Sequence, residues 1–328
     1  MPTMTGLWNK PEDLDSNGRL RLILAGSPLD HWFCRWQREM EDDAECHDTL
    51  TSFYQTARCD IDVYPALAAR IQQVLGLTAN AQGWPCIALA LPDGRLIGAT
   101  PWQAVRNDNG HALLSLLVDA ALTWQEHPEA MQADAQQLTD ALEDMNFLPE
   151  PQELPDRELL LGGLEAHAMN EADTIEGGFG PAPRFFHVPL LHALLDRVAD
   201  GRAARGLRAQ IERSLNALIA GGCYDHLNGG FFHGSTDSHW GVPFFEKTCA
   251  DQAALAQLFL HAAQVLECQL YEDIAFDTLA WTCHHLRQQD GGFIRGLSAE
   301  SIGADNQRVN GAAYSWSQQA VYDLLGRE

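Results

Sequence analysis

Several features that define common protein classes are absent from this sequence. The eight cysteines are scattered and form no CxxC pair, so the spacing predicts neither a zinc site nor any other metal centre. No run of about 18 apolar residues occurs, and no membrane span is expected. The start, MPTMTGLWNKPEDLD, has no basic segment followed by an apolar one. We therefore expect a cytoplasmic protein with free, mostly buried thiols.

Basic residues are also scarce. The 328-residue chain has 21 Lys and Arg against 45 Asp and Glu, a formal charge of −24. This balance argues against nucleic acid and against anionic membrane surfaces as partners. No GxSxG, phosphate-loop or dinucleotide-binding motif is present, so nothing predicts a nucleophilic serine or a nucleotide cofactor. The 46% hydrophobic content is that of a globular protein with one large domain or two.

The first third of the chain alternates strand and helix patterns. Residues 18–25 alternate and then become apolar, as a partly buried strand does, and Asp30 can cap the helix that follows. The expected elements are that strand, a helix from His31 to about Gln55, a strand at 57–63, a helix at 64–75 ending at Gly76, strands at 86–92 and 95–99, and a helical region from Pro101 to about Met145 with a break near His127. This order is typical of a thioredoxin-like domain.

The reactive cysteines of that fold sit where the first of these strands meets its helix. A CxxC motif over residues 30–33 would need cysteine at both ends, and Asp30 and Phe33 stand there instead. Exchange through two thiols is therefore not expected. Cys34 remains in the first helical turn, where a helix amino end can activate a lone thiol, or it is simply buried. Pro85 is a candidate cis proline.

From Pro155 onward the patterns predict helices only. The expected helices cover residues 157–171, 187–199, 202–220, 248–267, 270–289 and 316–326. Three glycine-aromatic sequences separate them at intervals of roughly 50 to 60 residues, and these are Gly177-Gly178-Phe179-Gly180, Gly229-Gly230-Phe231-Phe232 and Gly291-Gly292-Phe293. Helical hairpins joined by such turns indicate an (α/α) toroid, with a solenoid of hairpins as the alternative. The helices suffice for about half of a six-hairpin ring, so the toroid-like domain is incomplete.

One stretch of the chain concentrates polar and aromatic residues. Residues 221–251 read GGCYDHLNGGFFHGSTDSHWGVPFFEKTCAD, without helical or alternating periodicity, between two predicted helices. A long ordered loop of this kind usually carries function. Its chemically capable residues include Asp225, His226, His233, Asp237, His239, Trp240, Glu246, Lys247 and Asp251.

These motifs resemble those of the spermatogenesis-associated protein 20-like family, in which a thioredoxin-like domain is fused to a six-hairpin glycosidase-like domain. The family motif CHWCHVMERESFED is similar to residues 30–43, where His31, Trp32, Arg38 and Glu39 match and both cysteines are replaced. GGWP is similar to residues 82–85, and GGFGxAPKFP to residues 177–186. The longest family motif resembles the whole of residues 221–251, with His233 and Phe244 in place of an arginine and a histidine. Family members are about twice as long as this chain.

The resemblance implies a thioredoxin-like domain lacking the CxxC motif at 1–110, a helical connection at 111–155 and a partial six-hairpin glycosidase-like domain at 156–328. It implies carbohydrate binding or processing in a pocket of the helical domain. The alternatives are a non-catalytic binding or scaffold protein and a single-thiol redox protein that uses Cys34. The expected ligand is a carbohydrate or another small molecule, and a homo-oligomer is a further expected association.

The candidate site residues follow from the longest motif. The catalytic candidates are Asp225, His226, Asp237, Glu246 and Asp251, and the binding candidates are Tyr224, His233, Trp240 and Lys247. Glycoside hydrolysis would need two of the carboxylates, epimerisation would use a histidine as acid or base, and Trp240 could stack on a sugar. The competing interpretation is structural: Glu246 and Lys247 form an ion pair, and Asp225 and Asp251 cap helices.

Overall fold

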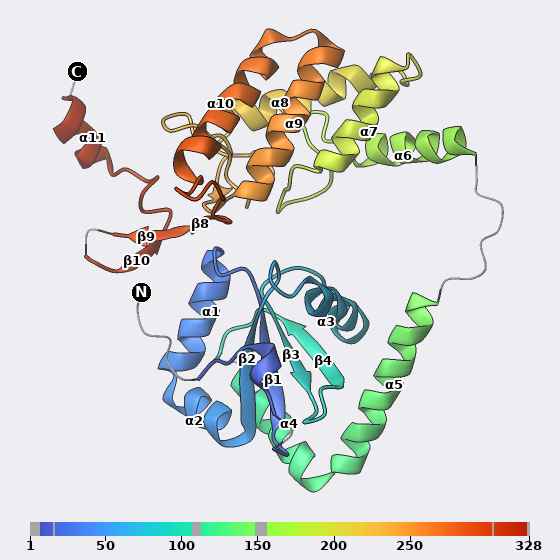
Figure 1. Ribbon diagram of the computed structural model, residues 1–328, viewed down its shortest axis with the longest axis vertical. Helices are drawn as coiled ribbons and strands as arrows, with labels where there is room; N and C mark the ends of the chain where they lie inside the picture. Colours follow the sequence, from blue (N-terminus) through green and yellow to red (C-terminus); the bar gives the residue numbers. More distant parts are fainter. Residues whose placement is uncertain (1–6, 16, 107–112, 148–155, 304, 327–328) are drawn as a thin grey trace. The chain divides into compact units, whose positions relative to one another are not determined.

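The computed structural model describes residues 7–15, 17–106, 113–147, 156–303 and 305–326. The chain divides into two compact units, Met1–Pro151 and Gln152–Glu328, which we call the α/β unit and the helical unit (Figure 1). Of the predicted connection at 111–155, residues 111–112 and 148–155 lie outside the described residues. Within the described ranges, no helix is long and apolar enough to cross a lipid bilayer.

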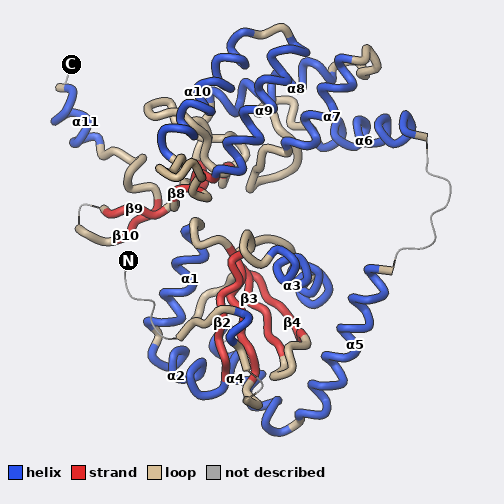
Figure 2. Tube along the Cα trace, viewed as in Figure 1, coloured by secondary structure: helices blue, strands red, loops and turns tan. Residues whose placement is uncertain are grey.

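The α/β unit is built on a four-stranded mixed sheet with strand order β2-β1-β3-β4 (Figure 2). Strand β1 is parallel to β2, and β3 is antiparallel to both of its neighbours. The elements in chain order are the 3-10 helix Pro11–Asp13, β1 Leu20–Gly26, α1 His31–Asp42, α2 Ala44–Phe53, β2 Tyr54–Asp60, α3 Pro65–Ala79, β3 Cys86–Ala90, β4 Leu96–Pro101, α4 Leu113–Glu126 and α5 Pro128–Asn146.

Helices cover both faces of this sheet. Side chains alternate between the faces of a strand, and in β1 Leu22 and Leu24 belong to the core that also contains residues of α1, α2 and α4. Ile23 and Ala25, between and beyond them, belong to a second core with α3. The near-continuous apolar run of β1 is thus explained by burial on both faces.

Several boundaries differ from those expected from the sequence, and one is that of β2, which covers residues 54–60 where a strand at 57–63 was expected. The first long helix is divided in two, because Asp43 is extended and its carboxylate accepts from the amide of Cys46, which caps α2. Helix α3 continues through Gly76 and ends at Asn80, which takes the left-handed conformation. Pro101 closes β4 and does not open a helix. The predicted break near His127 is confirmed between α4 and α5.

The helical unit contains the predicted helices with small shifts of their ends. They are α6 Arg157–Glu171, α7 Val188–Ala199, α8 Leu207–Ala220, α9 Cys249–Leu266, α10 Gln269–His285 and α11 Gln318–Leu325. The expectation of helices alone is wrong in the connecting segments, which pair short strands: β5 Gly234–Ser235 with β6 Pro243–Phe244, β7 Lys247–Thr248 with β8 Gly296–Leu297, and β9 Glu300–Ile302 with β10 Arg308–Asn310.

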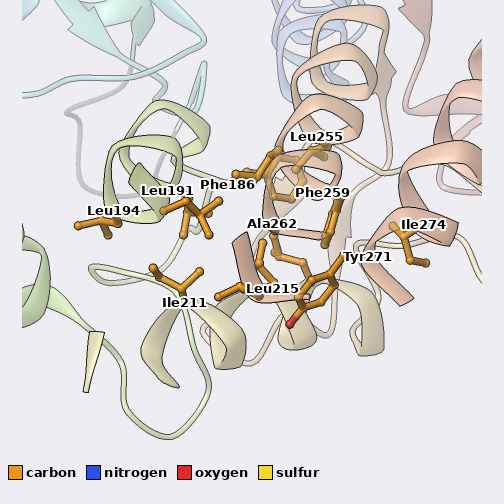
Figure 3. Close-up of a cluster of buried hydrophobic side chains, with 14 of the residues drawn as sticks. Phe186, Leu191, Leu194, Ile211, Leu215, Leu255, Phe259, Ala262, Tyr271 and Ile274 are labelled. Carbon is orange, nitrogen blue, oxygen red and sulfur yellow. The ribbon is translucent and has the colours of Figure 1, made fainter. Parts of the chain in front are cut away.

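Helices α7 to α10 bury one common core. Leu191 and Leu194 of α7 belong to the same cluster as Leu255 and Phe259 of α9, and Leu191 is the one of the two leucines nearer to α9 in Figure 3. Helix α9 packs against both α7 and α10, so α9 is the central helix of the unit. The apolar stripes predicted for α7 and α9 are therefore core, as amphipathic helices require.

Candidate functional site

The first half of the 221–251 stretch is a tight loop closed by Asp225. Its carboxylate oxygen Oδ1 accepts from the backbone amides of Leu227 and Asn228, at 3.1 and 3.0 Å. Its own amide donates to the carbonyl of Gly230 at 3.0 Å, and its carbonyl accepts from Gly229 at 2.7 Å. Gly229 and Gly230 both have positive φ, a conformation that other residues rarely adopt. The glycine pair is therefore required for the shape of this loop.

Lys247 braces the loop from behind. Its side chain is fully buried, and Nζ donates to Asp225 Oδ2 at 2.7 Å and to the carbonyl of Gly229 at 2.8 Å. The ammonium also lies over the rings of Phe232, Trp281 and Tyr314, at 4.6, 4.7 and 5.2 Å from their centroids. Aromatic faces attract a desolvated cation, so this buried charge has a carboxylate, a carbonyl and three rings as partners.

Each partner of this ion pair shifts the pKa of the other against the effect of burial. Burial lowers the pKa of Lys247, and the hydrogen bond to Asp225 opposes that change. Burial alone would raise the pKa of Asp225, but Lys247 and the two loop amides outweigh it, so the pKa of Asp225 lies below its usual value. We therefore treat the pair as carboxylate and ammonium at neutral pH. A catalytic acid needs the opposite shift.

The same loop is built a second time around Asp173. Its Oδ1 accepts from the amides of Ile175 and Glu176, both at 2.9 Å, and its Oδ2 accepts from Arg184 at 2.6 Å. Arg184 also donates to the carbonyl of Gly177 and lies over the ring of Trp240. The hydrogen bond with Arg184 is the largest cause of a pKa of about 2 for Asp173.

The two loops therefore share one set of contacts: a carboxylate on two amides, a buried cation on that carboxylate, and an indole under the cation. The second glycine of each loop faces the indole as well, since a Cβ on Gly178 would lie 2.6 Å from Trp240 and one on Gly230 would lie 2.7 Å from Trp281. A contact set that appears twice at different places in one unit is a folding device. Asp225 and Lys247 thus brace the loop in this structure.

Asp237 and Trp240 organise the second half of the stretch. The Asp237 carboxylate accepts from the amides of His239, Gly241 and Val242, at 2.8, 3.0 and 2.7 Å. Trp240 is 2% exposed, and its ring stacks on Phe186 at 6.4 Å. The ring of Trp240 is therefore part of the core of the helical unit.

His233, Asp251 and Glu246 form a second group at the start of α9. Nδ1 of His233 lies 2.7 Å from Asp251 Oδ2, which also accepts from the hydroxyl of Thr248 at 2.6 Å. Thr248 caps α9 and receives the amide of Asp251. Glu246 is buried, and its carbonyl accepts from the amide of His233 at 2.9 Å. The structural interpretation was wrong in its partners: Lys247 pairs with Asp225 rather than Glu246, and Thr248 rather than Asp251 caps α9. Asp225 closes a loop and does not cap a helix.

Tyr224 and His226 are two predicted residues that border open space. They line a hollow of about 450 Å³ beside α10, together with the loop residues 225–229 and with Asp277, Ala280, Trp281, His284 and His285. We call it the α10 hollow. A second hollow of about 520 Å³ shares residues 224–228 and is bordered by Phe232, Phe245, Tyr314 and Trp316. The braced loop is thus the common wall of two hollows.

Three polar residues of the α10 hollow were missed in the sequence. Asp277, His284 and His285 are exposed on α10, and the charge of Asp277, after burial, raises the pKa of Tyr224. Burial, followed by the charges of His284 and Lys247, lowers the pKa of His285. Residues 277, 281, 284 and 285 lie on one face of the helix. This spacing was the signal in the sequence that could have identified them.

In the α/β unit, Asp30 caps α1 as predicted, through the amides of Trp32 and Phe33 at 3.0 and 3.3 Å. Phe33 is core, and Cys34 is half-buried with Sγ donating to the carbonyl of Pro28 at 3.4 Å. The Trp84-Pro85 bond is cis. Across the described part of the chain, no cluster of three or more His, Cys, Asp or Glu side chains has an arrangement suited to a metal ion.

No family model matches the chain. Spermatogenesis-associated protein 20 of Homo sapiens is 26% identical over 310 residues, covering 92% of this chain and 39% of that protein. The Rattus norvegicus protein of the same name is 25% identical with the same coverage. An uncharacterised protein of Caenorhabditis elegans is 22% identical over 320 residues, covering 94% of this chain and 43% of its own. The chain spans about two fifths of the length of the curated relatives that it matches, and these similarities support its resemblance to the spermatogenesis-associated protein 20-like family.

Proposed function

We propose that the helical unit is a partial six-hairpin glycosidase-like toroid that binds a carbohydrate in the α10 hollow, and that the α/β unit is thioredoxin-like without dithiol chemistry. The strand order β2-β1-β3-β4, with β3 antiparallel to the others, supports the second assignment. Helices α7 to α10 around one core, separated by glycine-aromatic loops, support the first. A scaffold role without any ligand is the alternative.

The observation that carries the proposal is the composition of the α10 hollow. Exposed His226, Asp277 and His284 surround the half-buried ring of Tyr224. Such sites combine an apolar surface with a few polar groups that fix the orientation of a small ligand. Imidazole and carboxylate side chains can donate to and accept from hydroxyl groups. The volume of about 450 Å³ suits a small ligand.

Binding is favoured over hydrolysis by the state of the carboxylates. A glycoside hydrolase needs one carboxyl group as acid and a second as nucleophile or base. Asp225 is held by Lys247, Asp237 by three backbone amides and Asp251 by His233 and Thr248. Each of these three carboxylates is therefore engaged in holding the loop or the start of α9. Asp277, on α10, is the exposed carboxylate of the hollow.

Titration with a panel of neutral, amino and acidic sugars tests this proposal. We expect at least one sugar to bind, and we expect Asp277→Asn and His284→Ala each to weaken that sugar about tenfold or more, because each removes a hydrogen bond to a charged or polar group worth about 1.5 kcal/mol. Asp273→Asn, an exposed substitution on the same helix outside the hollow, is the matched control. Calorimetry gives the affinities.

The controls decide between binding in the hollow and the scaffold alternative. No binding of any sugar to the unsubstituted chain would contradict the proposal. Equal affinity in Asp277→Asn and in the unsubstituted chain would place the ligand elsewhere. Substitution of Asp225 is unsuitable for this purpose, because it would leave Lys247 buried without its carboxylate.

A thiol assay tests the absence of dithiol chemistry. Cys46 and Cys86 are buried, and burial raises the pKa of each thiol to about 12. We expect Cys34, which is half-buried, to be the thiol of the α/β unit that an electrophilic dye modifies first under native conditions. We also expect no catalysed reduction of a peptide disulfide. Catalysis that disappears in Cys34→Ser would instead support a single-thiol redox protein.

A further inference from the structure

Two histidines from neighbouring helices meet nitrogen to nitrogen in the helical unit. His192 of α7 and His261 of α9 place their Nδ1 atoms 2.9 Å apart. Their ring planes differ by 19° and their centroids are 5.1 Å apart. The rings are therefore nearly parallel, and their Nδ1 atoms face each other. Both side chains are half-buried. At this distance the two nitrogens can share a single proton, one ring donating and the other accepting.

Asp196 determines which of the two rings donates the proton and which accepts it. Its Oδ1 lies 3.4 Å from Nε2 of His261, which favours a proton on that nitrogen and leaves Nδ1 of His261 as the acceptor. Nδ1 of His192 is then the donor, and Nε2 of His192 carries no proton. That atom is buried and has no hydrogen-bond partner in the described parts of the chain. A second proton between the rings would set two N–H groups against each other.

Few other charges act on this pair. Helix α7 contributes Asp196, and its Arg197 is committed to Glu158 and Glu165. Helix α9 has one carboxylate, Asp251, which lies at its opposite end with His233.

Helix α8 also packs on α7, and its Arg208 pairs with Glu212 while its Arg213 donates to Gln210. Helix α10 packs on α9, and its acidic and histidine residues are Glu272, Asp273, Asp277, His284 and His285. Asp196 and His261 are the groups whose charges affect the pKa of His192. The state of the pair is therefore set mainly by its own protons and by Asp196.

We propose that His192 and His261 form a proton-sensitive clasp between α7 and α9, closed when one proton is shared and opened when both imidazoles are protonated. The clasp joins the same two helices as Leu191 and Phe259, which belong to the common core (Figure 3). Opening it removes a polar bond between these helices and introduces two like charges, while the apolar contacts remain. The helices are loosened rather than unfolded.

The direction of the pH effect follows from His192. Burial, and then the charge of His261, lower the pKa of His192 below its ordinary value of 6.5. A group with a lowered pKa in the folded state stabilises that state above its unfolded pKa, and this contribution is lost as the pH falls through the folded pKa. The clasp is therefore closed at pH 8 and opens only at a pH below the ordinary histidine pKa of 6.5.

Hydrogen exchange of α7 and α9 tests the clasp in the full chain. At each pH the unsubstituted protein is compared with His192→Leu and His261→Leu, so that intrinsic exchange rates cancel. At pH 8 we expect both variants to exchange several-fold faster in α7 and α9 than the unsubstituted protein. At pH 5 we expect this difference to vanish or reverse. Replacement of the exposed His167 of α6 by leucine is the control and should change neither helix.

Imidazole NMR of the unsubstituted protein provides a measurement that does not depend on the variants folding. We expect His261 as the Nε2-protonated tautomer and His192 as the Nδ1-protonated tautomer at pH 8. The opposite tautomers, or an ordinary pKa for His192, would overturn the proposal. So would an equal effect of His192→Leu on exchange at pH 5 and pH 8.

Discussion

Replacing Lys247 with methionine is expected to destabilise the helical unit by about 3–5 kcal/mol, because removal of one partner leaves a buried charge uncompensated. The remaining Asp225 carboxylate would keep its two amide donors but lose the ammonium at 2.7 Å. The carbonyl of Gly229 would lose a donor at the same time. Urea unfolding followed by tryptophan fluorescence measures the loss, because Trp281 lies directly under the ammonium.

A second substitution separates loss of the ion pair from loss of packing. Asp225→Asn combined with Lys247→Met removes both charges, and we expect it to be more stable than Lys247→Met alone, since no unpaired charge remains. Arg213→Met, at an exposed position of the same unit, controls for the change in net charge and should stay within about 0.5 kcal/mol. A double variant less stable than Lys247→Met would show that the carboxylate has a stabilising role independent of the lysine.

Gly230→Ala is expected to be the other strongly destabilising change. The backbone there has φ +74°, and a Cβ would lie 2.7 Å from Cδ2 of Trp281. The left-handed conformation costs a residue other than glycine about 1–2 kcal/mol, and overpacking adds about 1–3 kcal/mol. Thermal unfolding of the helical unit measures the sum.

Gly291→Ala separates the two contributions. Gly291 also has a positive φ, of +90°, but no atom lies within 4 Å of its would-be Cβ. Gly291→Ala therefore has the conformational cost of the positive φ without a steric clash. We expect this variant to lose less stability than Gly230→Ala. If both variants lost the same amount, the indole of Trp281 would have moved aside and the loop would not depend on it.

The elements of the chain could be predicted largely from local patterns. Asp30 was recognised as a helix cap because a cap acts on residues two and three positions ahead. The boundary at Asp43 was missed because Asp43 sits among other acidic residues that read equally well as a helix surface. Gly76 was taken as a helix end, but a glycine inside a helix is tolerated when the flanking turns are packed, as Val74 and Leu75 are.

The site was less predictable, because its contacts join residues far apart in the sequence. Asp225 and Lys247 were both named as candidates, yet their pairing across 22 residues could not be read from the sequence. The sequence around a buried lysine that braces a loop does not differ from the sequence around an exposed lysine that binds a ligand. Trp240 shows the same limit, since an aromatic residue in a polar loop is equally consistent with a core position and with a ligand platform.

The double use of the 224–229 wall separates the residues that hold its shape from those that face solvent. The shape depends on Asp225, Gly229, Gly230 and Lys247, which are engaged inside the unit, whereas His226 and Leu227 are exposed. Exchanges at 226–228 can therefore alter what either hollow recognises without refolding the loop. The same division makes residues 226–228 the natural positions for a randomised library, and it allows ligand preference to diverge between relatives whose loop frame is identical.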